Sequence, residues 1–230
     1  MPAATRTVTT MSNAGSQLVR LLTWLSPAFP TGGYAYSHGL EWAVEAGDIR
    51  DEATSARWLR DVAQHGAGRS DAILLRHAHR AATVQALAAV AELAAAAQPS
   101  AERRAETLAQ GAAFTLAASV WGAPLLAAQT GEIAYPVALG ALAAAHGVAE
   151  DDAALGSLHA FTANLVSACV RLVPLGQTAG LRIQAALAPV LAAVAADTRD
   201  AGLDDLGGVC FRSDIASMRH ETQYTRLFRT

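Results

Sequence analysis

Apolar positions recur every three or four residues along most of this chain, which is the spacing of one face of an α-helix. The most regular stretch spans residues 152–172, where one seam contains Leu155, Leu158, Thr162, Leu165, Cys169 and Leu172. No run of alternating β-branched residues predicts a strand. The pattern therefore predicts an all-α fold.

The expected helices are bounded by glycine, proline or residues that can cap a helix. They span residues 17–25, 37–46, 52–65, 70–97, 101–121, 137–146, 152–172 and 176–188. Because their connections are short, we predict a single-domain antiparallel helical bundle over residues 17–230, with the helix at 152–172 in its centre. Residues 1–16 are predicted to be a disordered tail, and residues 197–208 a mobile acidic connection.

A chain of 230 residues is long enough to form one domain without disulfides or metals, since it buries roughly 70–75% of its unfolded surface. The net charge is −3 and no basic stripe occurs, so proteins are expected as partners, with no nucleic acid and no membrane. Residues 107–131 carry no charge and could span a bilayer by length. Because this stretch contains Gln110, Gly111, Gly122 and Pro124, a buried hairpin is favoured, with a spanning helix as the alternative.

All 17 basic residues are arginine, and the absence of lysine excludes several kinds of chemistry. A phosphate-binding P-loop, a pyridoxal enzyme and a protein kinase each require a lysine. The glycines do not form a dinucleotide-binding fingerprint either. Any nucleotide hydrolysis is therefore expected to belong to a partner.

The sequence contains no recognisable catalytic or metal-binding motif, so neither an enzyme nor a cofactor is expected. His77 and His79 point to nearly opposite sides of a helix, which argues against a shared metal ion. Cys169 and Cys210 are interpreted as reduced thiols of a cytoplasmic protein, because no secretion signal is apparent. Catalytic groups can assemble across a fold, so a hydrolase or transferase with a site under the proline-rich loop remains the rival hypothesis.

That loop, residues 26–41, is the most distinctive segment of the chain. Its prolines and glycines predict a fixed backbone path rather than a linker. We expect it to present its aromatic side chains and then to enter a helix through a serine cap, with a glutamate in the first turn. The candidate contact residues are Phe29, Pro30, Gly32, Gly33, Tyr34, Tyr36, Ser37 and Glu41.

Two further segments are candidates for contact. Arg171, with Gln177, is predicted to fix the turn around Pro174 and Gly176, while binding of a partner's carboxylate is the alternative. The C-terminal segment, residues 220–230, is apolar for a chain end, which favours docking on another chain over packing on its own helices. Its candidate anchors are Tyr224, Arg226, Leu227, Phe228 and Arg229.

These segments together resemble the family of the urease accessory protein UreF. The loop matches the family's Ser-Pro-x-x-Pro-x-Gly-Gly-aromatic-x-aromatic-Ser-x-Gly-Leu-Glu segment. The blocks at residues 135–140, 171–177 and 220–230 follow in the family's order. Thr230 and Leu181 depart from the pattern, since the family often has serine and glutamine there.

The resemblance implies an all-helical, cytoplasmic chaperone for urease maturation that forms a homodimer. Its implied partners are a UreD/UreH-like accessory protein and a nickel-carrying, UreG-like GTPase, and urease apoprotein through their complex. The resemblance also implies that the C-terminal segment becomes ordered on the UreD side, and that a face near the dimer axis receives the GTPase. Nickel would be delivered to urease at the expense of GTP, and the chain itself would act as a scaffold.

Overall fold

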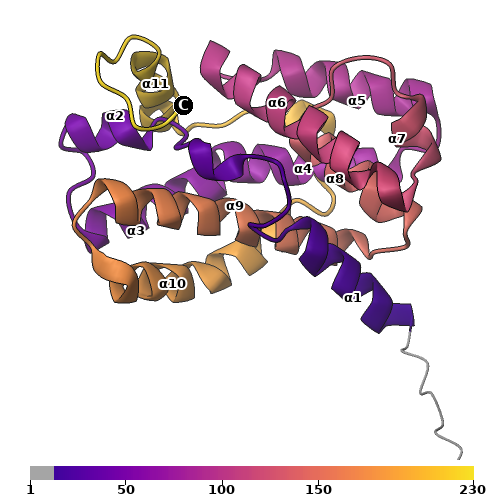
Figure 1. The fold of residues 1–230 in the computed structure, drawn as a ribbon, viewed down its shortest axis with the longest axis horizontal. Coiled ribbons are helices and arrows are strands. Elements are labelled where there is room, and N and C mark those ends of the chain that lie inside the picture. Colours follow the sequence, from indigo (N-terminus) through magenta and orange to yellow (C-terminus); the bar gives the residue numbers. More distant parts are fainter. Residues whose placement is uncertain (1–12) are drawn as a thin grey trace, which may run out of the picture.

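Residues 13–230 are described by a computed structural model, in which helices are joined by short loops (Figure 1). The all-α prediction is confirmed, because the described residues contain no strand. The α-helices are α1 (Asn13–Trp24), α2 (Leu40–Glu45), α3 (Glu52–His65), α4 (Ala67–Arg80), α5 (Val84–Ala96), α6 (Ala101–Ala118), α7 (Pro124–Ala128), α8 (Tyr135–Ala145), α9 (Glu150–Leu172), α10 (Gly176–Asp197) and α11 (Phe211–His220). Short 3-10 helices are η1 (Gly33–Ala35), η2 (Ser119–Trp121) and η3 (Leu203–Asp205).

Several predicted boundaries are wrong. The single helix expected at residues 70–97 is two helices, α4 and α5, because the chain bends after Arg80 and Thr83 caps α5 by accepting from Ala86 N–H over 3.1 Å. α10 continues through Pro189 to Asp197 rather than ending near residue 188. The short helices α7 and α11 were not predicted. Residues 13–16 belong to α1 rather than to a tail, and the rest of the predicted tail lies outside the described residues.

The core consists of two clusters that meet at α4 and α9. In one cluster, apolar side chains of α4, α5, α6 and α8 surround Phe114, which is fully buried. In the other, α2, α3, α9 and α10 surround Leu59 and Leu165. Within the predicted seam of α9, Leu158, Leu165 and Cys169 are buried, but Leu155 is 40% exposed.

One buried arginine joins α4 to α9 and α10. Arg76 is 1% exposed, and its Nη2 donates to Ala195 O over 2.6 Å and lies 2.9 Å from a carboxylate oxygen of Asp151. Its Nη1 is 2.5 Å from a carboxylate oxygen of Glu150. Because a buried guanidinium left unpaired is costly, these contacts fix the ends of α9 and α10 against α4.

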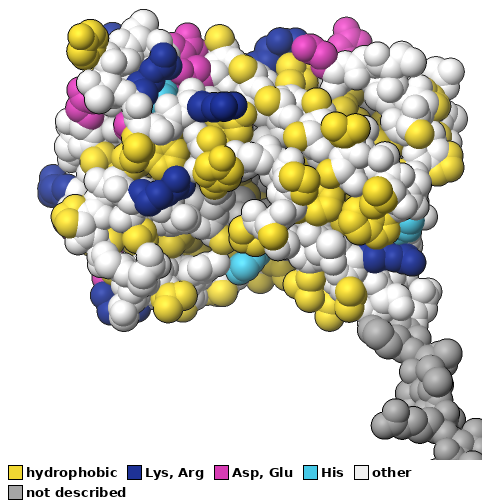
Figure 2. Space-filling model, in the orientation of Figure 1, with side chains coloured by type: hydrophobic (Ala, Val, Ile, Leu, Met, Phe, Trp, Pro, Cys, Tyr) yellow, Lys and Arg dark blue, Asp and Glu magenta, His cyan; other side chains and the backbone are white. Residues whose placement is uncertain are grey.

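Figure 2 shows one face of the molecule, on which several arginines lie over the half that carries α2, α9 and the C-terminus.

By length and composition alone, α9 and α10 are the helices of the described chain that could cross a membrane. Both instead contribute side chains to the core. The uncharged stretch at residues 107–131 is divided among α6, η2 and α7, so its interpretation as a spanning helix is wrong.

The packing of α8 on α4 leaves no room for a side chain at Gly140, since a Cβ there would lie 2.3 Å from Leu75 O. Gly140→Ala is expected to reduce the free energy of unfolding by about 2 kcal/mol or more through overpacking. Gly131→Ala is the control, because its nearest neighbour would be 3.5 Å away. Urea unfolding measures both variants, and equal stabilities would contradict this packing.

Candidate docking surface

The loop at residues 26–41 follows a fixed path over the body of the protein. Phe29 N–H donates to Ser26 O over 2.8 Å, and Thr31 N–H donates to Phe29 O over 2.7 Å. At the start of η1, Asn164 of α9 holds the backbone by donating from Nδ2 to Gly33 O over 2.9 Å. Hydrogen bonds to the backbone thus shape the loop and attach it to α9.

Left-handed backbone conformations let the loop turn twice. Gly32 has a φ of 73°, which explains one member of the predicted glycine pair, whereas Gly33 begins η1. His38 has a φ of 57° and Gly39 a φ of 75°. At Gly39 a Cβ would lie 2.5 Å from Ser217 N, so only glycine fits between the loop and α11.

The loop does not present all three of its aromatic side chains, and the prediction is wrong for two of them. Phe29 is buried against Phe114, with ring centroids 5.2 Å apart, and Tyr36 is only 7% exposed. Tyr34 is 72% exposed. The apolar rings of Phe29 and Tyr36 therefore stabilise the fold, and Tyr34 remains available for contact.

Ser37 and Glu41 bind the C-terminal segment. α2 begins at Leu40 after Gly39, so Ser37 is not its cap; its hydroxyl donates to Thr230 O. The Glu41 carboxylate accepts from Leu227 N–H over 2.6 Å and from Phe228 N–H over 2.9 Å. Ser37 is not the N-cap residue, but as predicted its hydroxyl accepts from an N–H of the first turn, that of Glu41, over 3.4 Å, and Glu41 itself lies in that turn.

The C-terminal segment lies beside the loop. Arg229 N–H donates to Ala35 O over 2.9 Å, and Ser37 N–H donates to Thr230 O over 2.7 Å. Phe228 and Thr230 are buried against other parts of the same chain. For these two residues, the structure of the single chain therefore shows packing on its own helices, which was the alternative to docking on another chain. Tyr224 is fully exposed and Leu227 is 68% exposed.

Arg171 stabilises this segment rather than the turn that follows α9. Its guanidinium lies 4.3 Å above the centre of the Phe228 ring, a cation–π contact, and its Nε donates to Ser167 O over 3.2 Å. Gln177 is exposed and has no side-chain hydrogen bond to a described residue, so the predicted joint role with Arg171 is wrong. Gly176, with a φ of 70°, makes the turn after the exposed Pro174.

A buried carboxylate lies under the junction of loop and C-terminus. Glu106 of α6 is 2% exposed, and one of its oxygens is 2.6 Å from His38 Nε2. The other accepts from Arg103 and, over 2.8 Å, from the Thr230 hydroxyl. Gln110 completes the set by donating to Glu106 over 3.0 Å. We call Glu106 and these four partners the Glu106 network.

Burial and the contacts within the Glu106 network shift the pKa values of Glu106 and His38. Burial alone would raise the pKa of Glu106, but the charge of Arg103 and the contact with His38 outweigh it and lower this pKa to about 2. Burial, followed by the charge of Arg103, lowers the pKa of His38. Near neutral pH the network therefore contains a carboxylate, a guanidinium and a neutral imidazole.

A cavity of about 310 Å³ lies between the loop, α4, α6 and α9, and His38, Asp71, Glu106 and Tyr135 are among the residues that line it. Asp71 accepts no hydrogen bond from a described residue, and burial raises its pKa to about 6. Buried Cys169 has its pKa raised by burial to about 12, which makes it a poor nucleophile. Within residues 13–230, no group of three or more histidine, cysteine, aspartate and glutamate side chains is placed to hold a metal ion.

The Glu106 network was not predicted from the sequence. Arg103 and Glu106 are three residues apart in a predicted helix, which is the spacing of an ion pair and the one local signal available. Their contacts with His38 and Thr230 join residues 65 and 124 positions apart. Only the fold brings these residues together.

The fold and this surface define a class: an all-helical protein in which a shaped loop and the chain's end form one continuous surface with exposed aromatic and apolar side chains. Comparison with known proteins specifies the class further. The UreF family model matches residues 49–188. The chain belongs to the UreF family of urease accessory proteins, which act in urease maturation.

Relatives in several bacteria support the assignment over nearly the full length. The UreF protein of Bradyrhizobium sp. strain BTAi1 is 53% identical over 220 residues, which cover 93% of this chain and 92% of the relative. That of Xanthobacter autotrophicus strain Py2 is 54% identical, covering 95% and 93%. That of Rhodopseudomonas palustris strain BisB5 is 50% identical, covering 100% and 98%. Each is named urease accessory protein UreF.

Two tyrosines of the loop should respond differently to truncation. Tyr36→Ala removes a buried ring and is expected to cost about 2–4 kcal/mol of unfolding free energy. Tyr34→Ala, two residues away, is expected to change it by less than about 0.5 kcal/mol, because its side chain is exposed. Thermal and urea unfolding of the matched pair distinguish them, and a large loss for Tyr34→Ala would place that ring in the core.

Asp71 should make stability depend on pH. Because its folded pKa of about 6 exceeds the ordinary value of 3.8, the folded state binds the proton more tightly, and stability falls as pH rises between these values. Asp71→Asn removes the charge of this half-buried side chain, so it is expected to stabilise the protein more at pH 7.5 than at pH 4.5. Urea unfolding at both values tests this, with the exposed Asp204→Asn as control. A gain that does not depend on pH would contradict it.

Proposed function

We propose that this protein is a scaffold for urease maturation in the cytoplasm, on which a UreD/UreH-like accessory protein and a UreG-like GTPase assemble to insert nickel into urease. Membership of the UreF family supports a role in maturation. The lack of lysine supports the assignment of GTP hydrolysis to the partner, since a P-loop requires one. The chain itself supplies shape and neither catalyses a reaction nor holds the nickel.

The observation that carries the proposal is the pairing of the loop with the C-terminal segment. Backbone hydrogen bonds fix both segments, yet Tyr34, Tyr224 and Leu227 stay exposed. Aromatic and apolar groups carried on a fixed backbone lose less conformational entropy on binding than groups on a free chain, which makes them suitable anchors. We assign Tyr224 and Leu227 to contact with the UreD/UreH-like protein.

Phe228 and Arg171 serve this surface indirectly. Buried Phe228 with Arg171 above it holds the backbone on which Leu227 is placed. Arg226 forms an ion pair with Glu102 over 2.9 Å and is 42% exposed in its side chain, so one side of it faces solvent. Arg226 and Arg229 are assigned to the polar rim of the same contact, where arginine is enriched.

A homodimer is part of the proposal. On α1, Leu18, Val19 and Leu22 are each more than half exposed. An exposed apolar helix face of this kind is typical of an interface, and α1 lies at the edge of the molecule in Figure 1. A dimer of two copies joined at these faces would offer two binding surfaces to each partner protein.

One measurement tests the docking role. Tyr224→Ser with Leu227→Ser is expected to abolish co-purification with the UreD/UreH-like partner while the circular dichroism and the melting temperature stay within a few degrees of the parent. Leu116→Ser with Val120→Ser is the matched control, because those side chains are 78% and 79% exposed on α6 and η2. If the first variant still binds like the control, the assigned surface is wrong.

A second measurement tests the scaffold role itself. Cells that lack this protein are expected to make urease with little nickel, and the purified protein to hydrolyse no GTP unaided. Metal analysis of the isolated urease and a phosphate-release assay check the two expectations. Fully nickel-loaded urease from such cells, or turnover of GTP by the protein alone, would overturn the proposal.

A further inference from the structure

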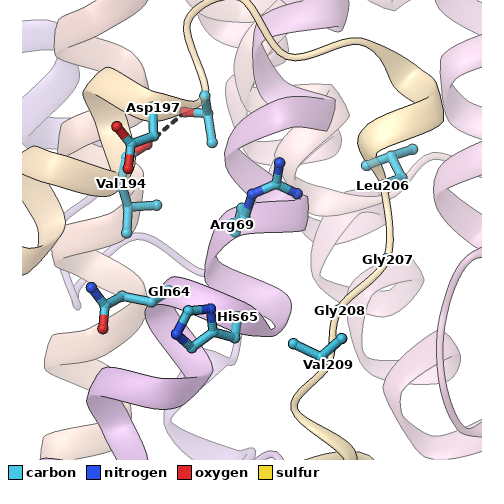
Figure 3. A pocket seen from close by; sticks show the side chains of 10 residues that line it. Gln64, His65, Arg69, Val194, Asp197, Leu206, Gly207, Gly208 and Val209 are labelled. Carbon is cyan, nitrogen blue, oxygen red and sulfur yellow. Dashed lines mark hydrogen bonds between the residues drawn. The ribbon is translucent and has the colours of Figure 1, made fainter.

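A second cavity, apart from the loop and the C-terminal segment, has the shape and chemistry of a ligand site. Its volume is about 560 Å³, which is within the roughly 300–1,000 Å³ of small-molecule pockets. It lies between the end of α3, the first turn of α4, the end of α10 and the segment at residues 206–209 (Figure 3). We call it the Arg69 cavity.

Arg69 lies in the middle of this cavity without a counter-ion. Figure 3 shows its side chain between the end of α10, with Val194 and Asp197, and the segment from Leu206 to Val209. Its Nη1 donates to the carbonyl of Asp205 over 2.6 Å, and no described carboxylate is within 4.0 Å of its guanidinium. By contrast, Arg76 and Arg80 of the same helix both pair with Glu150.

Two backbone N–H groups without a described acceptor belong to residues that line the same cavity. The N–H groups of Gly207 and Gly208 have no acceptor among residues 13–230, whereas the next N–H, of Val209, donates to His65 O over 3.0 Å. Gly208 is pressed against the corner between α3 and α4, since a Cβ there would lie 2.4 Å from His65 O. The glycine backbone is thus held where a ligand can approach it closely.

The remaining groups around the cavity define the ligand further. Val194, Leu206 and Val209 contribute apolar side chains to the wall. Asp197 is exposed at the rim, where its charge disfavours anions with two negative charges. One oxygen of the Asp205 carboxylate accepts from Gly202 N–H over 2.8 Å.

We propose that the Arg69 cavity binds a small aliphatic carboxylate. The carboxylate would accept paired hydrogen bonds from Arg69 and from the backbone of Gly207 and Gly208, a geometry that suits the planar guanidinium. The hydrocarbon part would lie on Val194, Leu206 and Val209. The site is independent of the docking surface, because it shares no residue with the loop at 26–41 or the segment at 220–230.

The test follows the amide signals of Gly207 and Gly208 in ¹⁵N-labelled full-length protein at constant ionic strength. Butyrate, inorganic phosphate and butylamine are titrated separately. Butyrate is expected to shift these signals saturably, phosphate to bind more weakly because it lacks the apolar part, and butylamine to leave them unchanged. Tighter binding of phosphate than of butyrate, or no saturable shift with butyrate, would overturn the proposal.

Two variants examine the contacts separately. Arg69→Gln is expected to weaken butyrate binding by about tenfold to a hundredfold, the range for losing a charged hydrogen bond, whereas the exposed Arg60→Gln leaves it unchanged. Val209→Asp keeps Arg69 and its bond to Asp205 but adds a negative charge to the cavity, so it should also weaken binding. Val120→Asp, on a distant exposed position, is its control. If Arg69→Gln and Val209→Asp both bind butyrate as tightly as the parent, the proposal is contradicted. Val209→Asp keeps this test valid if Arg69→Gln also displaces the segment at residues 206–209.

Discussion

The buried carboxylate of Glu106 is the constraint on which the arrangement of the loop and the C-terminal segment depends. Its four partners come from the proline-rich loop, from α6 itself and from the last residue of the chain. A buried carboxylate is tolerated only when its oxygens are satisfied, so these segments must be in place together. The position of the chain's end is thus fixed from inside the protein rather than by surface contacts alone.

This constraint explains why apolar and aromatic groups can remain exposed beside the chain's end. A terminal segment normally frays, because few contacts oppose its conformational entropy. Here the Glu41 carboxylate accepts hydrogen bonds from the backbone N–H groups of Leu227 and Phe228, and the Phe228 ring is buried under Arg171. The backbone is therefore immobile where Leu227 projects, which reduces the entropy that binding of a partner would cost.

The sequence predicted the helical class, because this depends on local patterns of apolar residues. Periodicity identified α3 with its observed bounds and placed α9 within two residues of them. It failed at residues 81–83, where a break in an alanine-rich stretch has no glycine or proline to mark it. Which aromatic rings are buried could not be predicted, since Tyr34 and Tyr36 differ only in what the fold places beside them.

The same distinction separates the two proposed sites. Most residues of the proposed docking surface could be nominated from the sequence because they lie in two short segments, residues 26–41 and 220–230. The Arg69 cavity was not, because its walls come from α3, α4, α10 and the segment at residues 206–209, and none of these carries a motif. The charged group of this cavity is a guanidinium without a described counter-ion, on a helix whose other two arginines are both paired. An ion pair requires two segments that the fold brings together. That Arg69 lacks a carboxylate partner among the described residues can therefore be seen only in the folded structure.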